Sequence, residues 1–259
     1  MTHGVFDIRG RTALVTGSSR GIGRALAQGL VEAGCSVALH GRDPATLEQA
    51  AAELAGPAQH AGGRVHHVAF DVTDGAAAEA GVAAVEAELG PLDILVNNAG
   101  VQHRAPLLEF PEAEWHRIVE SNLTSAFLVG RAAARGMVER GRGKIVNVAS
   151  LQSELARAGT APYAASKGGL KMLTRGMCAD WGPAGVQVNA IGPGYFDTEL
   201  TSALVADAEF DALLRRRTPA ARWGRPEELV GALLFLASPA SDFVNGQILY
   251  VDGGMSAVI

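Results

Sequence analysis

The sequence predicts an α/β fold in which helices cover both faces of a seven-stranded, doubly wound parallel sheet. Short apolar runs alternate with longer helical patterns along all 259 residues. Such alternation is typical of βαβ units joined by right-handed crossovers. The runs are mostly continuous stretches of Val, Ile, Leu and Ala, as expected for parallel strands that are buried on both faces. No linker, repeat or low-complexity tract interrupts the pattern, so residues 1–259 are expected to form a single domain.

Each element follows from this pattern in chain order. Strands are expected at 12–16, 36–40, 65–70, 94–96, 144–148, 186–190 and 248–251. Amphipathic helices are expected at 21–33, 44–54, 76–89, 112–140, 162–181 and 226–237. Pro44 and Pro226 would stand at the first helical position, where proline is favoured. Residues 192–218 break the rhythm with a Gly-Pro-Gly turn and short helical pieces, and a long excursion at a strand end predicts a substrate lid.

The composition argues against several classes of protein. Hydrophobic residues make up 48% and charged residues 19% of the chain, which is an ordinary globular balance. A net charge of -5 gives no indication of binding to nucleic acid or to an anionic membrane, and no apolar run reaches spanning length. Two cysteines, Cys35 and Cys178, in unrelated contexts suggest neither disulfides nor a metal site and favour a cytoplasmic location. The histidines also lack the spacing of metal ligands, so no metal is expected.

A glycine-rich turn between the first strand and the first helix predicts a Rossmann-type dinucleotide site. Gly17 permits a sharp turn, Gly21 lets backbone amides approach a pyrophosphate, and Gly23 allows close contact between helix and sheet. The spacing Gly-x-x-x-Gly-x-Gly differs from the usual Gly-x-Gly-x-x-Gly. Its place between strand and helix nevertheless favours a binding loop over a simple turn. The loop residues expected to bind the cofactor with these glycines are Ser19, Arg20 and Ile22.

The end of the second expected strand indicates which cofactor is bound. An acidic residue commonly binds the ribose 2′-hydroxyl there, but residues 40–43 read His-Gly-Arg-Asp, with glycine at the expected position of the acid. Arg42 and Arg20 would suit a 2′-phosphate, because guanidinium groups bind phosphate bidentately. This chemistry predicts a preference for NADP(H) over NAD(H). The alternative is that both arginines are surface residues and that Asp43 binds the hydroxyl.

Tyr163 and Lys167 form a Tyr-x-x-x-Lys pair, which is the candidate for proton transfer. Four residues place both side chains on one face of a helix. The pKa of a free tyrosine is near ~10, and an adjacent ammonium group would favour the phenolate and lower that pKa. A hydroxyl from Ser150 could hydrogen-bond the substrate oxygen that gains or loses the proton. The pair alone occurs by chance in many helices, so its weight depends on the motifs that accompany it.

With Asn-Asn-Ala-Gly at 97–100, these motifs resemble the short-chain dehydrogenase/reductase family along essentially the whole chain. The resemblance implies metal-free hydride transfer between a nicotinamide and a carbinol or carbonyl carbon. It implies that Tyr163 is the general acid/base and that Ser150 orients the substrate oxygen. Lys167 would lower the tyrosine pKa and hold the nicotinamide ribose, and Asn122 would anchor a proton-relay water. The alternatives are a structural amide for Asn122 and a strand-end cap for Ser150.

Further cofactor residues are expected at the ends of the later strands. Asp71-Val72 could place a carboxylate beside the adenine amino group, or Asp71 could cap a turn. The remaining residues of the expected cofactor site are Asn98, Ala99, Gly100, Tyr163, Lys167, Pro193 and Gly194.

The substrate half has a narrower resemblance, to the branch of the family that interconverts D-gluconate and 5-keto-D-gluconate. It rests on residues 101–104, 150–155, 172–178, 192–196 and 217–225. A sugar acid needs a cation for its carboxylate, which Arg104 could supply, and polar groups for its hydroxyls, which Gln152 and Glu154 could supply. Arg104 and Glu154 could equally be surface loop residues, and His103 stands where many such enzymes have arginine. The expected substrate residues are Arg104, Ser150, Gln152, Glu154, Tyr163 and Tyr195.

Two other functions fit parts of the sequence. A reductase of another ketone, such as a 3-oxoacyl thioester, would share the catalytic core but would need an apolar slot or a basic docking face. A non-catalytic redox sensor would typically lack the tyrosine or the lysine, and both are present here. The family resemblance also implies a homotetramer built on the helices at 112–140 and 162–181 and on the last strand region.

Overall fold

The computed structural model describes residues 4–258, so that residues 1–3 and 259 of the expected domain lie outside the described residues. Its centre is a seven-stranded sheet with the order β3-β2-β1-β4-β5-β6-β7, and every pair of neighbouring strands is parallel. The predicted fold class is therefore confirmed. The strands are β1 (Thr12–Val15), β2 (Ser36–Gly41), β3 (Val65–Ala69), β4 (Leu92–Asn97), β5 (Gly143–Val148), β6 (Val186–Pro193) and β7 (Ile248–Val251).

The strand order places a crevice beside β1. The chain moves outward from β1 through β2 to β3, then returns to β4 on the other side of β1. Ligands of doubly wound sheets bind where the strand order reverses in this way, outside the carboxyl ends of the strands. The carboxyl ends of β1 and β4 are followed by the glycine loop and by residues 98–100, so both motifs meet at this crevice.

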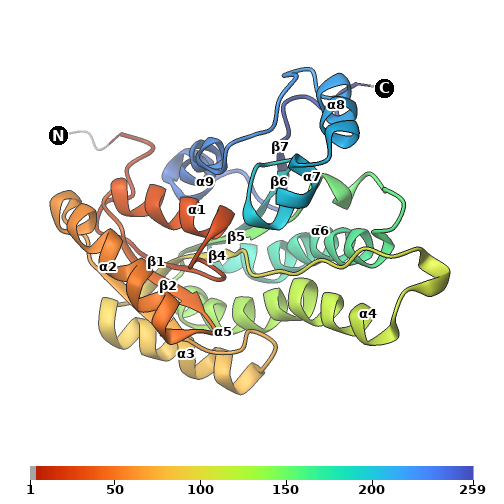
Figure 1. Ribbon diagram of the computed structural model, residues 1–259. Coiled ribbons are helices and arrows are strands. Elements are labelled where there is room, and N and C mark those ends of the chain that lie inside the picture. Colours follow the sequence, from red (N-terminus) through yellow and green to blue (C-terminus); the bar gives the residue numbers. More distant parts are fainter. Residues whose placement is uncertain (1–3, 259) are drawn as a thin grey trace.

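Helices form one layer on each face of the sheet (Figure 1). One face is covered by α1 (Gly21–Glu32), α2 (Pro44–Ala61) and α9 (Val230–Ala237), whose apolar side chains pack on β1, β2 and β4. The other is covered by α3 (Gly75–Leu89), α5 (Ser125–Glu139) and α6 (Ala161–Trp181). β1 is fully buried between these layers, which explains why its sequence is apolar without alternation.

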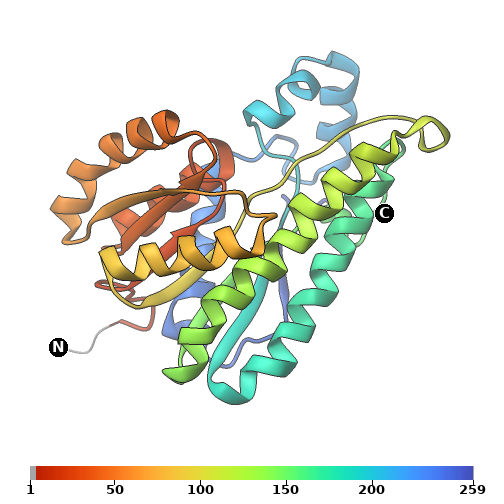
Figure 2. The same ribbon diagram turned by 90° about the horizontal axis from the view of Figure 1, so that it is seen from below.

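Three helices differ from the predicted ranges, and the one expected at 226–237 begins as a 3₁₀ turn (Pro226–Leu229) before α9. α2 does not end at residue 54: it continues through Pro57 to Ala61, because Ala58 extends the buried face of Leu47, Ala50 and Leu54 by one more turn. Gly62 then ends it with a positive φ of 84°. The expected helix 112–140 consists of α4 (Glu112–Val119), a π-helical turn (Glu120–Thr124) and α5. Figure 2 shows the resulting long rod lying beside α6.

The segment after β6 forms short helices, as its sequence predicts. A 3₁₀ turn (Glu199–Thr201), α7 (Ser202–Val205) and α8 (Ala208–Arg217) stand above the carboxyl ends of β6 and β7 (Figure 1). They pack through a small apolar cluster of their own, which contains Leu204, Leu214 and Trp223. The short helices therefore pack apart from the two main cores, whereas Phe196, just after β6, belongs to the first of them. Across the part of the chain that the structure describes, no helix is both long and apolar enough to cross a membrane.

Candidate active site

A cavity of about 820 Å³ opens at the carboxyl ends of the strands, a size that suits a small-molecule or cofactor site. Every residue expected to bind the cofactor lines it, from the glycine loop to Gly194. Of the expected catalytic and substrate residues, Arg104, Ser150, Gln152, Tyr163, Lys167 and Tyr195 also line it. Asn122 and Glu154 are not among the residues that line this cavity.

The glycine loop has the shape of a phosphate cradle. Gly17 and Gly21 have positive φ angles of 63° and 57°, which favour glycine. A Cβ atom on Gly23 would lie 2.2 Å from the carbonyl oxygen of Gly17, so only glycine fits where α1 meets the loop. The amino end of α1 therefore stays open to a bound phosphate, and these residues fit the pyrophosphate of a dinucleotide.

The Asn-Asn-Ala-Gly segment is tied to the glycine loop by side-chain hydrogen bonds. The Asn98 amide donates to the carbonyl oxygens of Thr16 and Gly17, at 2.9 Å each. The Thr16 hydroxyl accepts from the backbone N–H groups of Asn98 and Ala99. Asn98 therefore acts here as a brace between two loops, which leaves the backbone of residues 98–100 to face the cavity.

Tyr163, Ser150 and Lys167 converge on the middle of the cavity. Tyr163 and Lys167 lie on α6, with the Lys167 ammonium 5.8 Å from the centre of the tyrosine ring. Lys167 is buried and donates to the carbonyl oxygen of Val148 at 2.7 Å. Ser150 follows β5, and its hydroxyl accepts from the backbone N–H of Gln152 at 3.1 Å. The serine therefore caps a 3₁₀ turn (Leu151–Ser153), and it is also hydrogen-bonded to Tyr163.

The acid–base properties differ from the simple expectation for this pair. Desolvation in the cavity wall raises the pKa of Tyr163, while the hydrogen bond from Ser150 and the charge of Arg104 act in the opposite direction. Burial lowers the pKa of Lys167 to about 8. The groups that act to lower the tyrosine pKa in this structure are therefore Ser150, through a hydrogen bond, and Arg104, through its charge.

Asn122 occupies the π-helical turn between α4 and α5. Its side-chain oxygen accepts from the Val101 N–H at 2.7 Å, and its amide donates to the Val101 carbonyl oxygen and to the Ser166 hydroxyl. The side chain thus clamps the loop after β4 to α6, which matches the structural alternative. Such turns are frequent at functional sites, because they shift the backbone out of the regular helical register.

At the adenosine end, Arg20, Arg42 and Asp43 all line the cavity, but the Asp43 carboxylate already has partners of its own. The Asp43 carboxylate caps α2 by accepting from the Ala45 N–H at 3.2 Å and from the Thr46 hydroxyl. The Asp71 carboxylate accepts from the N–H and hydroxyl of Thr73, at 2.9 and 2.7 Å, so it caps a turn and also lines the cavity. These contacts leave the two arginines as the cationic side chains nearest the expected 2′ position.

At the substrate end, two guanidinium groups line one wall. Arg104 donates to the Gln102 side chain at 3.0 Å. Desolvation lowers the pKa of Arg104, as does the positive charge of Arg157, whereas Tyr195 and Tyr163 act in the opposite direction. The Arg157 guanidinium lies 4.3 Å from the ring centre of Phe210, on α8. Sequence reasoning missed Arg157 and Gln102, although Gln102 falls within one of the stretches that carry the substrate resemblance and Arg157 lies two residues beyond another.

Two substrate-half residues lie elsewhere. The Glu154 carboxylate pairs with Lys171 and accepts from the Tyr250 hydroxyl at 3.1 Å, so the structure does not bring it to the cavity that Gln152 and Tyr195 line. Lys171 lies one helical turn after Lys167, and its ion pair with Glu154 keeps that carboxylate outside the cavity. His103 lies 3.5 Å from the Glu114 carboxylate and packs edge-on against Phe110. His103 is not among the residues that line the cavity.

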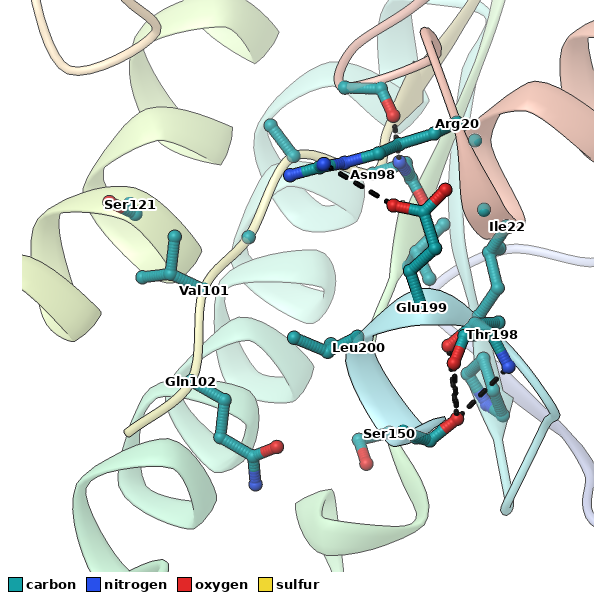
Figure 3. A pocket seen from close by; sticks show the side chains of 18 of the residues that line it. Arg20, Ile22, Asn98, Val101, Gln102, Ser121, Ser150, Thr198, Glu199 and Leu200 are labelled. Carbon is teal, nitrogen blue, oxygen red and sulfur yellow. Dashed lines mark hydrogen bonds and ion pairs between the residues drawn. The ribbon is translucent and has the colours of Figure 1, made fainter. Parts of the chain in front are cut away.

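The segment after β6 closes over the cofactor side of the cavity. Glu199 forms an ion pair with Arg20 at 3.3 Å, and both side chains are largely exposed. Figure 3 shows Glu199 reaching the glycine loop, with Leu200 pointing into the cavity. Thr198, Thr201 and Leu204 complete this wall. The expected lid position is consistent with this arrangement, whereas no sequence signal had indicated the Arg20–Glu199 contact.

Comparisons with known proteins agree with this geometry. The family model described as "Enoyl-(Acyl carrier protein) reductase" matches residues 17–256. The gluconate 5-dehydrogenase of Gluconobacter oxydans (strain 621H) is 54% identical over 99% of both chains. The 5-keto-D-gluconate 5-reductase of Escherichia coli (strain K12) is 51% identical over 98% of this chain and 99% of its own. A crystal structure of a gluconate 5-dehydrogenase from Burkholderia cenocepacia J2315, in complex with NADP and tartrate, superposes with a TM-score of 0.92 at 52% identity and covers 98% of each chain. The chain belongs to the short-chain dehydrogenase/reductase family.

Proposed function

We propose that this chain is an NADP(H)-dependent oxidoreductase that interconverts D-gluconate and 5-keto-D-gluconate. The observation that carries this substrate class is the pair of guanidinium groups, Arg104 and Arg157, on the wall beside Tyr163. A carboxylate between them would relieve their mutual repulsion and accept charge-assisted hydrogen bonds. The likeness to enzymes of gluconate supports the same substrate. The thioester alternative is less favoured, because a cationic wall lined with Gln102 and Gln152 does not suit an apolar chain.

The residues of the chain supply the proton chemistry. A nicotinamide dinucleotide held by the glycine loop and residues 98–100 would supply hydride transfer to or from the substrate carbon. Tyr163 removes or supplies the proton at the substrate oxygen, and Ser150 donates a hydrogen bond to that oxygen. Lys167, held by the Val148 carbonyl, keeps a positive charge below the phenol ring and can reach a ribose hydroxyl. Asn122 keeps the loop after β4 in place and, by family resemblance, anchors a relay water.

The proposed cofactor preference rests on charge. Arg20 and Arg42 can bind a 2′-phosphate bidentately, whereas the Asp43 carboxylate, which also lines the cavity, already accepts hydrogen bonds from the Ala45 N–H and the Thr46 hydroxyl. The position usually taken by an acid is Gly41, and a Cβ atom there would make only ordinary contacts, at 3.4 Å or more, with Leu47. No steric reason therefore excludes an acid, so the glycine at this position favours the phosphate by leaving out a repelling charge.

We also propose that the chain acts as a homotetramer in the cytoplasm. Side chains on the outer faces of the expected interface elements are apolar and exposed, namely Phe127 on α5, Met172 on α6 and Leu249 on β7. Covering them in a second copy would remove this surface from water. Both cysteines are free, which fits a reducing compartment.

The test is turnover with matched variants. The native enzyme should reduce 5-keto-D-gluconate with NADPH and oxidise D-gluconate with NADP. Arg104→Ala and Arg157→Ala should each raise KM for the sugar acid about 10-fold or more, because each removes a charge-assisted hydrogen bond of roughly 1.5–3 kcal/mol, and each should scarcely affect a neutral ketone.

Arg117→Ala is the control, because Arg117 pairs with Glu114 and is not among the residues that line the cavity. Equal losses on charged and neutral substrates would assign both arginines a structural role. A native enzyme that ignored both sugar acids would refute the substrate and leave only the oxidoreductase class.

A further inference from the structure

His40 is a buried polar residue at the cofactor end that neither the proposed chemistry nor the known motifs use. It is 2% exposed, at the end of β2, and its ring contacts that of Phe70 in a tilted arrangement with centroids 4.1 Å apart. It also lines the cavity between the glycine loop and the end of β3. A buried imidazole in such a place needs partners for both ring nitrogens.

The partners fix the tautomer of the ring. The Gly17 N–H points at Nδ1, at 3.2 Å, and a backbone N–H can only donate, so Nδ1 must accept. Nε2 lies 3.0 Å from the Phe70 carbonyl oxygen, which can only accept, so Nε2 must carry the hydrogen. A neutral ring protonated on Nε2 alone satisfies both contacts. A proton on Nδ1 would point at the hydrogen of the Gly17 N–H, so the hydrogen bond between Gly17 and the ring would be lost.

The backbone of His40 forms hydrogen bonds with Ser18, the residue that follows Gly17 in the glycine loop. The His40 N–H donates to the Ser18 hydroxyl, and the Ser18 N–H donates to the His40 carbonyl oxygen, each at 2.9 Å. The Ser18 hydroxyl in turn donates to the carbonyl oxygen of Val15 at 2.7 Å. Ring and backbone of one residue thus fix Gly17 and Ser18, where the chain leaves β1 with a positive φ and enters the phosphate cradle.

We propose that His40 is a positioning residue for the cofactor: its neutral ring, through Nδ1, holds Gly17 so that the loop amides face the pyrophosphate. The proposal requires only that the site binds a nicotinamide dinucleotide and is independent of the sugar-acid substrate. The charged groups around the ring are Asp71, whose carboxylate favours the protonated ring, and Arg42, two residues along the chain. Burial opposes that protonation and is the larger effect.

Three substitutions separate the two ring contacts. The side-chain oxygen of Asn can take the place of Nδ1 and accept from Gly17, whereas the side-chain amide of Gln can take the place of Nε2 and donate to Phe70. His40→Ala loses both contacts and should weaken NADPH binding about 5- to 10-fold, as expected for one lost hydrogen bond. His40→Asn should remain within about threefold of the native affinity, whereas His40→Gln should bind as weakly as the Ala variant.

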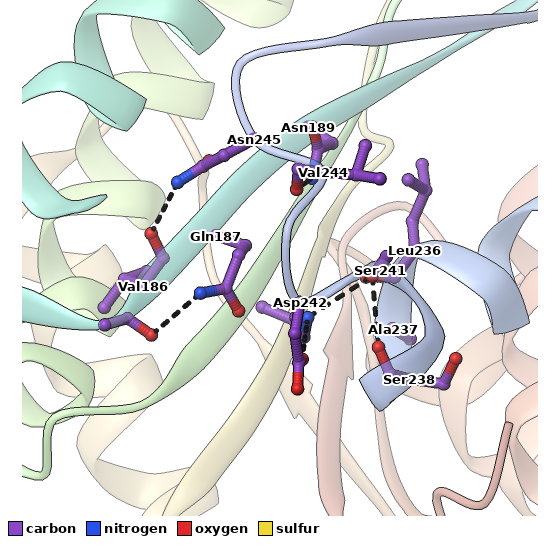
Figure 4. A network of polar contacts seen from close by, with 12 residues as sticks. Val186, Gln187, Asn189, Leu236, Ala237, Ser238, Ser241, Asp242, Val244 and Asn245 are labelled. Carbon is purple, nitrogen blue, oxygen red and sulfur yellow. Dashed lines mark hydrogen bonds and ion pairs between the residues drawn. The ribbon is translucent and has the colours of Figure 1, made fainter. Parts of the chain in front are cut away.

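A matched variant separates positioning from loss of stability. Ser241 is fully buried in the 3₁₀ turn after α9 (Pro239–Ser241), where its hydroxyl donates to the Leu236 carbonyl oxygen and accepts from the Lys144 ammonium at the amino end of β5. Figure 4 shows Ser241 beside Leu236 and Ser238, and it is not among the residues that line the cavity. Ser241→Ala should lower the melting temperature and leave NADPH affinity unchanged. If it weakens binding as His40→Ala does, the effect is global and the proposal fails. The proposal also fails if Asn binds no better than Gln.

A spectroscopic readout on the native protein needs no variant. In ¹⁵N spectra of histidine-labelled protein, His40 should show an unprotonated Nδ1 and a protonated Nε2 throughout pH 6–8, with and without NADPH. The opposite tautomer, or an imidazolium in this range, would overturn the proposal even if the variants did not fold.

Discussion

The two ends of the cavity are built by different means. The cofactor end is shaped by glycine conformations and by hydrogen bonds between short side chains and backbone carbonyls. The Asn98 brace and the cradle around Gly23 are the examples. At the substrate end, long side chains from separate segments, Arg104 and Arg157, meet beneath a short helical segment. A cofactor common to many enzymes can be bound by the backbone, whereas selection among substrates depends on side chains that can vary without altering the fold. Comparing the two ends therefore separates what the family shares from what this chain adds.

The largest expected effect lies between the two ends, at Tyr163. Tyr163→Phe removes the phenol that moves the proton, so kcat should fall by about 10²-fold or more. NADPH affinity, measured by fluorescence titration, should remain nearly native, because the ring itself stays. Retained kcat with an unchanged pH profile would exclude the proposed role.

Lys167→Met makes a useful contrast, because this lysine is expected to serve both ends. It should lower kcat and also weaken NADPH binding, unlike Tyr163→Phe. Variants with identical binding and rate losses would show that the two residues act as one unit.

A carboxylate at position 41 should shift the cofactor preference from NADPH towards NADH. Gly41→Asp should lower kcat/KM with NADPH by roughly 10- to 100-fold, because a carboxylate repels the 2′-phosphate, and raise it with NADH. Gly41→Asn has the same size without the charge and is the control. If both variants change kcat/KM alike, the preference is set by shape rather than by charge. The role proposed for Arg20 and Arg42 would then be wrong.

Lowering the pH should reduce the free energy of unfolding through His40, at the cofactor end. Burial lowers the pKa of His40 to about 4, whereas in the unfolded chain it is near ~6.5. Between these values the unfolded state binds more protons, so stability falls as pH falls from 6.5 towards 4. The native protein should lose up to about 2 kcal/mol of unfolding free energy between pH 7 and pH 5 from this residue. Urea titrations at both pH values measure the loss, and His40→Asn should lack that share of it.

The smallest effect is expected at the contact between the glycine loop and the segment after β6. Glu199 pairs with Arg20 in an exposed contact, and such pairs contribute about 0–1 kcal/mol. Glu199→Gln should free Arg20 for a 2′-phosphate and tighten NADPH binding a few-fold at low salt, while NADH binding stays the same. Equal changes for both cofactors would indicate a general movement of the lid.

The same contrast explains how much the sequence could predict. The fold class and the cofactor end follow from local patterns, because glycine spacing and strand alternation report directly on nearby backbone. The partners of Glu154 are not local: Lys171 and Tyr250 reach it from α6 and β7, so a loop acid expected in the cavity is paired outside it. Arg157 was missed for the same reason, since only the fold brings it to the wall near Arg104. His40 carried no recognisable motif, and its role follows from two backbone groups that meet only in the folded chain.

The π-helical turn at Glu120–Thr124 has a consequence for insertions and deletions. Such a turn contains one residue more than the α-helical path, and each residue rotates a helix by about 100°. The extra residue is taken up within the turn, and on either side of it α4 buries Ile118 and α5 buries a stripe through Ala126, Val129 and Ala133. Removing one residue from the turn would restore a regular helix with α4 and α5 in nearly the same orientation, but it would take away the backbone geometry from which Asn122 clamps Val101. A chain of this architecture should tolerate length changes in its surface loops far better than the loss of a single residue here.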